Sequence, residues 1–577
     1  MSHSNRPDGG ELLARTLKDA GVEQIFALHG GHLEAFWQGC QRHELRLTDF
    51  RHESSAGHAA DAYARCTGKV GVCAITSGPG FTNAVTAITN AYLDAVPVLF
   101  IVGAPPLRDV ETNPLQGGFD QISLATPITK WAHRVTHTQR IPELVAQAVR
   151  TCRNGRPGPV LLEIPIDVMH MPVEEAEVLP PGGLHVRTAP APAPEQVNAI
   201  IDMLKSAQRP GIFVGSGVPF SCAQAELRRF AEASGIPVFV NSHAQGALPY
   251  DHPLYAKDLG LLGMLPMMGQ PGIDALLMVG ARLGLFTGGR NPVPVPHDIP
   301  IAQVDLHGPE LGRLREAAIP VLADARETFR ALADAAAKTN WPDWSAWSAT
   351  AAGLKHMIAM MFGEPDLDVS PVHPFHAVRM VVEGAPADSI FVIDGGEASA
   401  WAHTAVCANA PHQVLGAGYL GCLGTGPGMA IGAALSHPGT TVVQLAGDGA
   451  LGFHLQEFET MARNELPIIT VVLNNALWGM SAHGQDLIYG AGKRVISTLP
   501  DTAYEEVAKA LGCYGERVTR LAELAPALRR ALAAGRPACL NVSINPDIVH
   551  PTMPTMVGAD TQGENEIMIP YYDNIRL

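Results

Sequence analysis

The chain has 577 residues, which is too long for one hydrophobic core and predicts three domains, or four. Its net charge of −16 and the lack of a long basic run argue against nucleic-acid binding, which needs clustered Lys and Arg. Nine cysteines without CxxC spacing, no apolar run of about 18 residues and a polar start, MSHSNRPDGG, predict a cytoplasmic protein with reduced thiols and no membrane span.

Two changes in composition divide the chain into parts of domain size. The segment LPPGGLHVRTAPAPAPEQ, residues 179–196, is rich in Pro and Ala and predicts an extended linker. A softer change lies near residues 360–370. We therefore predict a first domain over 1–180, a middle domain over 195–345, a third domain over 370–548 and a C-terminal tail over 549–577.

Strand-like and helix-like segments alternate within each predicted domain. In the first, a helix over 10–20 precedes the strand EQIFAL, the turn Gly30-Gly31, the strand VGVCAIT, an Ala- and Asn-rich helix and the strand VPVLFIVG. The middle strands are PGIFVGSG, IPVFVN, ALLMVGA and IAQVDL, and those of the third domain are SIFVID, TVVQLAGDG, PIITVVLNN and ACLNVSI. Such apolar runs are typical of strands buried on both faces, so the predicted fold class is α/β with three open parallel-sheet domains.

Polar groups follow two neighbouring strands of the third domain. The strand TVVQLA ends in Gly447-Asp448-Gly449, a helix is predicted from Leu455 to Asn464, and the next strand ends in Asn474-Asn475. Ligands of parallel sheets bind beyond the carboxyl ends of the strands, which is where these groups are expected. A lone Gly-Asp-Gly also occurs as a turn with an N-capping Asp, but the Asn pair 26 and 27 residues after Asp448 favours a ligand site.

The same groups suit a metal–diphosphate site. Mg²⁺ prefers oxygen ligands and commonly takes one or two carboxylates together with phosphate oxygens. We predict Asp448, Asn475 and the backbone carbonyl of Leu477 as its protein ligands. Glycines beside Asp448 allow close approach of a phosphate, and N–H groups that open the next helix favour its charge.

This Gly-Asp-Gly to Asn-Asn spacing resembles the signature of thiamine-diphosphate enzymes. Three other segments resemble stretches of that family: Phe50-Arg51-His52-Glu53, the loop from Thr76 to Asn83, and the loop from Gly418 to Gly424. The resemblance covers almost the whole chain and implies pyrimidine-binding, middle (transhydrogenase-like) and diphosphate-binding domains. Their order is that of the acetohydroxyacid synthase and pyruvate oxidase branch.

Within this branch the chain most resembles the benzaldehyde lyases. The supporting segments are residues 28–32, 111–116, 127–134 and 310–314. Three positions depart from that pattern: Ile166 replaces an aromatic residue, Met480 replaces a small one, and Glu397 adds a charge. These departures leave open whether the substrate is aryl, aliphatic or a coenzyme A ester.

The resemblance implies roles for individual residues. Glu53 would activate the cofactor through its aminopyrimidine ring, and Leu423 would wedge the cofactor into a bent shape. His32 and Gln116 would lie near the reacting carbonyl, with His32 either a proton relay or a buried, hydrogen-bonded histidine. Gly31 would leave space beside the cofactor, where a larger side chain would shrink the acceptor pocket. Further cofactor contacts are implied at Pro79, Asn83, Ser399, Gly421, Gly447, Gly449, Ala450, Trp478, Gly479 and Met480.

The implied activity is a carbon–carbon lyase or carboligase that cleaves or forms 2-hydroxy ketones of the acyloin or benzoin type through an enamine intermediate. Alternatives are a 2-hydroxyacyl-CoA lyase, a 2-keto acid decarboxylase and an acetolactate-synthase-like enzyme. Four arginines could meet coenzyme A phosphates, or form structural salt bridges: Arg282, Arg290, Arg313 and Arg315. A non-catalytic cofactor-binding regulatory paralogue is a further alternative.

The expected cofactors are thiamine diphosphate and Mg²⁺. No FAD is expected, because Gly211, Gly215 and Gly217 do not complete a GxGxxG motif. The expected partners are a small aldehyde or 2-hydroxy carbonyl substrate and further copies of the chain, in a dimer with shared sites and commonly a tetramer. The tail could be a lid over the pocket or a subunit-contact arm.

Overall fold

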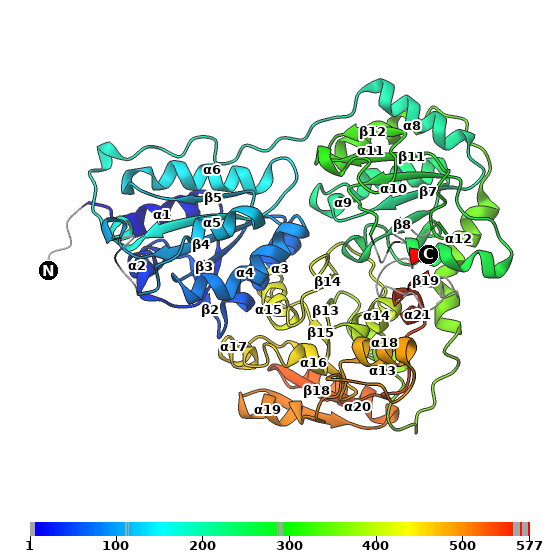
Figure 1. The fold of residues 1–577 in the computed structure, drawn as a ribbon. Helices are drawn as coiled ribbons and strands as arrows, with labels where there is room; N and C mark the ends of the chain where they lie inside the picture. Colours follow the sequence, from blue (N-terminus) through cyan, green and yellow to red (C-terminus); the bar gives the residue numbers. More distant parts are fainter. Residues whose placement is uncertain are drawn as a thin grey trace.

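The computed structural model describes residues 6–109, 112, 115–284, 287, 292–557, 566–567 and 575–576. Within them the chain forms three α/β domains, each built around a six-stranded, all-parallel sheet (Figure 1). The predicted fold class is confirmed. None of the helices in the described residues is both long enough and apolar enough to cross a membrane.

The first domain has the strand order β2-β1-β3-β4-β6-β5. Its strands are β1 (Gln24–Ala27), β2 (Arg46–Asp49), β3 (Gly71–Ile75), β4 (Val98–Ala104), β5 (Trp131–Arg134) and β6 (Val160–Pro165). Its helices are α1 (Gly9–Asp19), α2 (Glu34–Arg42), α3 (Glu53–Thr67), α4 (Pro79–Leu93), α5 (Gln121–Ala125), α6 (Ile141–Arg153) and α7 (Ile166–His170). The strands β3, β4 and β6 are wholly buried, as expected of a sheet covered on both faces.

A long connection leads from α7 to the middle domain. It crosses between the two domains without a strand or an α-helix (Figure 1). The middle sheet has the order β12-β11-β10-β7-β8-β9, which is that of doubly wound nucleotide-binding sheets. Its strands are β7 (Pro210–Val214), β8 (Val238–Val240), β9 (Tyr255–Asp258), β10 (Ala275–Val279), β11 (Ile301–Asp305) and β12 (Ile319–Leu322). Its helices are α8 (Pro194–Ser206), α9 (Gly217–Phe220), α10 (Gln224–Ser234), α11 (Ala325–Ala336) and α12 (Ser345–Met360).

The third domain has the order β14-β13-β15-β16-β18-β17, which repeats the topology of the first. Its strands are β13 (Ile390–Asp394), β14 (Val414–Gly416), β15 (Val442–Gly447), β16 (Ile469–Asn474), β17 (Tyr514–Val518) and β18 (Ala538–Ser543). Its helices are α13 (Pro374–Gly384), α14 (Glu397–Ala405), α15 (Gly426–Ser436), α16 (Asp448–Leu451), α17 (Glu457–Arg463), α18 (Gly479–Tyr489), α19 (Tyr504–Ala510) and α20 (Leu521–Ala533). The tail contributes α21 (Met553–Met556) and an antiparallel pair, β19 (Glu566–Ile567) and β20 (Ile575–Arg576).

Within the three domains, the strands that sequence patterns did not predict are the six edge strands, β2, β5, β9, β12, β14 and β17, together with β6; the tail strands β19 and β20 were not predicted either. Edge strands have one neighbour and need not be apolar on both faces, so they lack the run that marks central strands. The helix predicted from Leu455 to Asn464 is shorter than expected. The chain first forms the short α16 directly after Gly447, and α17 begins only at Glu457.

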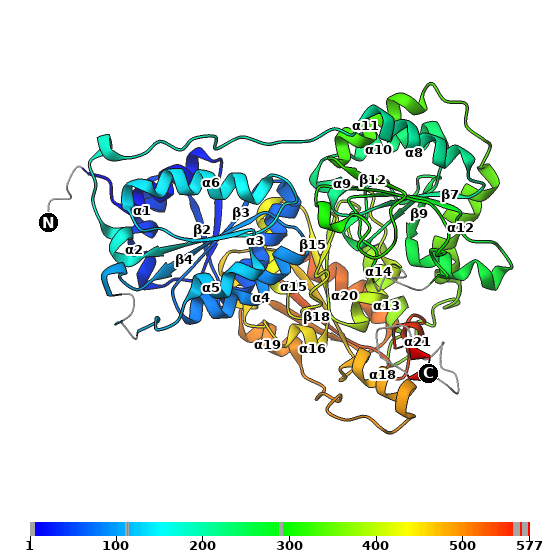
Figure 2. The same cartoon turned by 45° about the horizontal axis from the view of Figure 1, so that its top comes forward.

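The first and third domains share a core through α3 and α15 (Figure 2). Two glycines of α15 make this close packing possible. A Cβ at Gly428 would lie 2.4 Å from the carbonyl oxygen of Ser55, and one at Gly432 would lie 2.2 Å from that of Ala59. The helix that begins with Glu53 is thereby fixed against the domain that carries Asp448.

Candidate active site

Asp448 is a buried carboxylate whose hydrogen bonding is incomplete. It opens α16 directly after β15 and is 3% exposed, yet its Oδ2 atom has no hydrogen-bond partner in the described residues. Burial raises the pKa of Asp448 to about 7, against the opposing effect of the backbone N–H groups of Gly449 and Ala476. An unpartnered buried carboxylate of this kind fits a bound cation, which would offset the cost of burying its charge.

The turn after β16 lies beside this carboxylate. Strands β15 and β16 pair directly, with Gly447 opposite Leu473, so both strands end at the same edge. In the turn, Leu477 N–H donates to Oδ1 of Asn475 at 3.1 Å, and Ala476 has a positive φ of 54°. The predicted ligands Asp448, Asn475 and Leu477 therefore come together, and their oxygen atoms suit a hard divalent cation.

Glycines around the turn allow close packing of the neighbouring side chains. A Cβ at Gly449 would lie 2.5 Å from the Trp478 ring, and one at Gly479 would lie 3.0 Å from Oε2 of Glu397. Gly479 opens α18, and Met480 follows it, half-buried. The remaining residues predicted in this edge region are Gly447, which ends β15, Ala450 in α16, and Ser399 in α14, whose hydroxyl donates to the Gly395 carbonyl at 2.6 Å.

A buried aspartate holds the loop predicted to shape the cofactor. The carboxylate of Asp394, at the end of β13, accepts hydrogen bonds from the N–H groups of Gly424 at 3.2 Å and Gly426 at 2.8 Å. Burial raises the pKa of Asp394 to about 6. Gly421 in this loop has a φ of +66°, and Leu423 is half-buried. Sequence reasoning missed the role of Asp394, although it stands at a strand end like Asp448.

The residues predicted in the first domain form a second group. Glu53, the first residue of α3, is 7% exposed and its Oε2 accepts a hydrogen bond from Nδ2 of Asn83 at 2.9 Å. A Cβ at Gly80 would lie 3.7 Å from the other oxygen of Glu53. Pro79 opens α4, so Glu53 is adjacent to the segment from Thr76 to Asn83 that resembles a stretch of the family.

His32 and Gln116 belong to this group. Nδ1 of His32 hydrogen-bonds Oγ1 of Thr76 at 3.1 Å, and burial lowers the pKa of His32. The carbonyl of Gln116 accepts a hydrogen bond from the Ser77 hydroxyl at 2.6 Å. The adjacent residues Thr76 and Ser77 thus bind His32 and Gln116, respectively. Gly31 has no atom within 4 Å of an added Cβ, which leaves open space beside His32. Parts of the supporting segment 111–116 lie outside the described residues.

The two groups make no direct polar contact with each other in the described residues. In the described ranges, no hydrogen bond or ion pair joins Glu53, Asn83, His32 or Gln116 to the group around Asp448. Exposed apolar side chains occur in both domains: Leu115, Phe119 and Leu124 in the first, and Phe453, Tyr489 and Ile496 in the third.

Comparison with known proteins identifies this arrangement. Three models match in order: the thiamine pyrophosphate enzyme N-terminal TPP-binding domain over residues 7–124, the central domain over 197–332, and the C-terminal TPP-binding domain over 394–542. The acetolactate synthase large subunit IlvG of Mycobacterium tuberculosis is 33% identical over 549 residues, 94% of this chain and 96% of its own length.

The chain belongs to the thiamine pyrophosphate enzyme family. It falls in the acetolactate synthase and pyruvate oxidase branch. Two further relatives are a probable acetolactate synthase large subunit of Methanocaldococcus jannaschii, 29% identical over 98% of each chain, and 2-hydroxyacyl-CoA lyase 2 of Caenorhabditis elegans, 30% identical over 90% of this chain and 86% of the relative. The protein is thus a thiamine-diphosphate-dependent enzyme of carbon–carbon lyase or transferase type, with Mg²⁺ and a small-molecule substrate.

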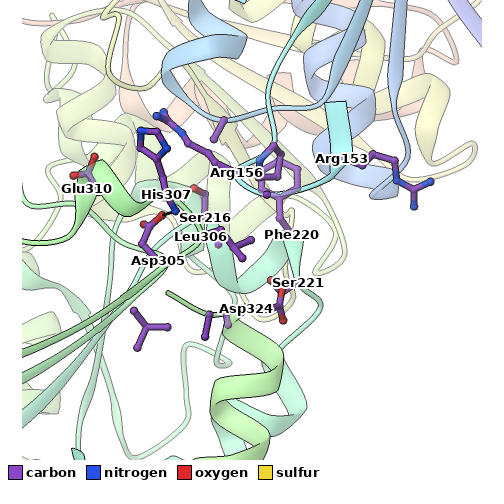
Figure 3. Close-up of a pocket in the computed structure, with 18 of the residues that line it drawn as sticks. Arg153, Arg156, Ser216, Phe220, Ser221, Asp305, Leu306, His307, Glu310 and Asp324 are labelled. Carbon is purple, nitrogen blue, oxygen red and sulfur yellow. Dashed lines mark hydrogen bonds between the residues drawn. The ribbon is translucent and has the colours of Figure 1, made fainter. Parts of the chain in front are cut away.

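This thiamine pyrophosphate enzyme has a cavity whose lining includes Arg282 but none of the residues predicted to bind the cofactor or the metal. It lies between the first and middle domains, at the carboxyl edge of the middle sheet, and Figure 3 shows its side chains. Arg153 and Arg156 come from the first domain, and Ser216, Asp305 and His307 follow middle-domain strands. The prediction that the middle domain holds no FAD stays a prediction.

The arginines considered for coenzyme A have protein partners where the structure describes them. Arg282 donates to the Leu93 carbonyl at 2.5 Å, and its guanidinium carbon lies 3.9 Å from the centre of the Tyr419 ring. Arg313 pairs with Glu310 at 2.9 Å, and Arg315 donates to the Val295 carbonyl at 3.2 Å. Arg290 lies outside the described residues.

Proposed function

We propose that this enzyme forms or cleaves the carbon–carbon bond of 2-hydroxy carbonyl compounds by transferring an acyl unit between a donor and an acceptor carbonyl. The observation that carries the proposal is the orphaned, buried carboxylate of Asp448 beside the Asn475 turn, in a chain with both cofactor-binding domains. When bound, thiamine diphosphate supplies the carbanion centre and electron sink that such a reaction requires.

Residues of the third domain would hold the metal and the diphosphate. Oxygen ligands would come from Asp448, Asn475 and the Leu477 carbonyl. The N-terminal ends of α16 and α18 would offer backbone N–H groups to the diphosphate. The other residues of this domain that we propose to contact the cofactor, at its diphosphate or elsewhere, are Ser399, Gly421, Leu423, Gly447, Gly449, Ala450, Trp478, Gly479 and Met480. Glycine at positions 447, 449 and 479 lets the backbone lie close to Ala398, Trp478 and Glu397, because an added Cβ would come within 3.3 Å of each of these side chains.

Glu53 would hold and move a proton at the pyrimidine end of the cofactor. Its carboxyl is buried and is oriented by the hydrogen bond from Asn83. It lies beside the first turn of α4, which begins with Pro79 and Gly80. A buried carboxyl fixed by one hydrogen bond exchanges a proton with a neighbouring ring nitrogen at low reorganisation cost.

His32 and Gln116 would orient the substrate carbonyl and hydroxyl groups. Because burial lowers the pKa of His32, its ring is neutral near pH 7 and can accept a proton. The hydrogen bond to Thr76 fixes the ring, and Gly31 leaves space for the substrate.

The substrate within this class stays open between three reactions. The acetolactate synthases among the relatives favour an acetolactate-synthase-like carboligation. The relative named 2-hydroxyacyl-CoA lyase 2 supports cleavage of a 2-hydroxyacyl-CoA. The resemblance of residues 28–32, 111–116, 127–134 and 310–314 to benzaldehyde lyases stays a prediction, and it would favour acyloin or benzoin cleavage.

Assembly and location also remain proposals. Two groups of site residues in different domains, with exposed apolar side chains in both domains, favour a dimer in which the first domain of one copy meets the third domain of another. A tetramer, a cytoplasmic location and the domain limits at 180, 195, 345, 370 and 548 stay predictions. Most of the tail beyond Val557 lies outside the described residues.

A product screen tests the proposal. The enzyme reconstituted with thiamine diphosphate and Mg²⁺ is incubated separately with benzoin, an aliphatic acyloin, pyruvate and a 2-hydroxyacyl-CoA, and the products are identified by mass spectrometry. We expect carbon–carbon cleavage or ligation with at least one of them. No such product, with no exchange of the cofactor C2 proton in deuterated water, would instead favour the regulatory paralogue.

A further inference from the structure

Glu397 links the candidate active site to the C-terminal part of the chain. It opens α14 after the Gly395-Gly396 turn and is 4% exposed. One carboxylate oxygen, Oε2, meets Nδ1 of His483 at 2.6 Å. The other, Oε1, accepts the backbone N–H of His550 at 2.6 Å. A single buried carboxylate therefore binds α18 and the segment after β18 at once.

His483 completes the link as a charged partner. Its Nε2 faces the carbonyl oxygen of Pro546 at 2.8 Å, while its Nδ1 faces Glu397. With Glu397 ionised, neither partner oxygen can donate, so this geometry favours the imidazolium form of His483, in which both ring nitrogens carry hydrogen. Burial works against this charge, but the hydrogen bond and charge of Glu397 and the Pro546 carbonyl outweigh it and raise the pKa of His483.

The opposite charges of Glu397 and His483 cancel, which explains how a buried carboxylate is tolerated beside the turn at Gly479. A Cβ at Gly479 would lie 3.0 Å from Oε2 of Glu397 and 3.2 Å from Nδ2 of Asn475. An uncompensated carboxylate so close to a proposed diphosphate site would repel the ligand. The His483 cation cancels that charge and leaves Glu397 free to act as a hydrogen-bond acceptor.

The segment held in this way packs on the candidate site. The His550 ring lies edge-on to Trp401, with ring centres 4.4 Å apart, and its Nε2 meets Oγ1 of Thr404 at 3.1 Å. Beyond it, α21 packs on α18, where Met553, Met556 and Val557 form an apolar cluster with Met480. Met480 in turn lies against the Gly396 turn, 3.2 Å from an added Cβ.

We propose that Glu397 and His483 are a positioning pair that fixes residues 546–557 so that Met553, Met556 and Val557 complete an apolar wall beside Met480 on the substrate side of the site. The wall favours donors whose group on the carbonyl carbon is apolar, and it excludes water from that side. This inference rests on the proposed function only in placing the apolar wall next to the substrate. The hydrogen bonds of Glu397 to His483 and His550, which we call the latch, do not depend on the reaction.

Hydrogen–deuterium exchange of the full-length holoenzyme tests the latch without any substrate. Glu397→Ala removes both acceptors, and we expect amides of residues 546–557 to exchange at least about tenfold faster than in the wild type. Glu397→Gln should restore slow exchange, because its oxygen can accept from His550 and its amide can donate to a neutral His483. Glu383→Gln, which breaks the exposed Arg379–Glu383 pair on α13, is the matched control. Unchanged exchange in Glu397→Ala would overturn the latch.

Kinetics test the wall with the substrate that the product screen identifies. Met556→Ser leaves Glu397 and His483 in place, so it also serves if Glu397→Ala does not fold. We expect its KM for the donor to rise about tenfold, while the Kd of thiamine diphosphate, followed by tryptophan fluorescence, changes less than about threefold. An equal loss of cofactor affinity, or an unchanged KM, would overturn the wall. A failed screen would remove the proposed function yet leave the exchange result standing.

Discussion

Gly428 of α15 faces the carbonyl oxygen of Ser55 in α3, and a Cβ on this glycine would lie only 2.4 Å from that oxygen. The contact fixes the helix that begins at Glu53 against the domain that presents Asp448. Gly432 repeats the contact one turn later, against Ala59. Backbone atoms cannot move aside as a flexible side chain can, so this helix pair tolerates no side chain at either position.

Substitution of Gly428 by Val should separate α3 from α15. We expect a loss of at least about 1–3 kcal/mol in the free energy of unfolding, since the added atoms meet backbone and not side chain. Urea unfolding followed by circular dichroism measures it. The control is Gly353→Ala in α12, where an added Cβ meets no atom within 4 Å and where alanine should stabilise the helix slightly. Equal effects of the two substitutions would contradict the close helix contact.

Substitution of Asp448 by Asn should abolish stabilisation by the cofactor and metal. At a ligand concentration of about 100 times Kd, the wild type should gain about 2.7 kcal/mol. The variant should gain almost nothing, although without ligands it should be at least as stable at pH 8 because an unpartnered buried charge is gone. Thermal unfolding with and without thiamine diphosphate and Mg²⁺ measures both effects. The exposed Asp388→Asn is the control, and a full ligand-induced gain in Asp448→Asn would refute the metal site.

The raised pKa of Asp448 predicts opposite effects of pH on metal binding and on stability. Metal binding needs the carboxylate, so Mg²⁺-dependent cofactor affinity should fall up to about tenfold per pH unit below pH 7. Without ligands, this group binds its proton more tightly in the folded state than in the unfolded one, where its pKa is about 3.9. Its contribution to stability therefore increases as the pH falls from 8 towards 5. Comparison with Asp448→Asn isolates both trends, which the variant should lack.

Substitution of Glu53 by Gln should lower kcat by about 10²–10⁴-fold, because a proton relay is removed while the shape is kept. The introduced amide would still hydrogen-bond Asn83, so the protein should fold and bind Mg²⁺ at the other half-site. Steady-state rates at saturating cofactor, with cofactor binding measured separately, make the distinction. Glu195→Gln, at the exposed start of α8, is the control. Normal turnover of Glu53→Gln at saturating cofactor would rule out the proposed role.

The sequence by itself predicted the three parallel sheets and the family, for a physical reason. Central strands such as β4 and β16 are buried on both faces and must be apolar throughout, which leaves a visible run in the sequence. Edge strands such as β5, with the sequence WAHR, are constrained on fewer sides and were missed. Local motifs also placed Asp448 and Asn475 at neighbouring strand ends, because the position of a strand end is a local property.

Only the tertiary structure decided how distant segments meet. The hydrogen bond from the His550 N–H group to Glu397 joins residues 153 positions apart, and no local pattern in either segment predicts it. The orphaned oxygen of Asp448, the hold of Asp394 on the Gly424 loop and the glycine contacts between α3 and α15 likewise depend on packing between elements. The sequence states the type of each side chain. Its burial and its hydrogen-bond partners depend on which groups from distant segments the fold places around it.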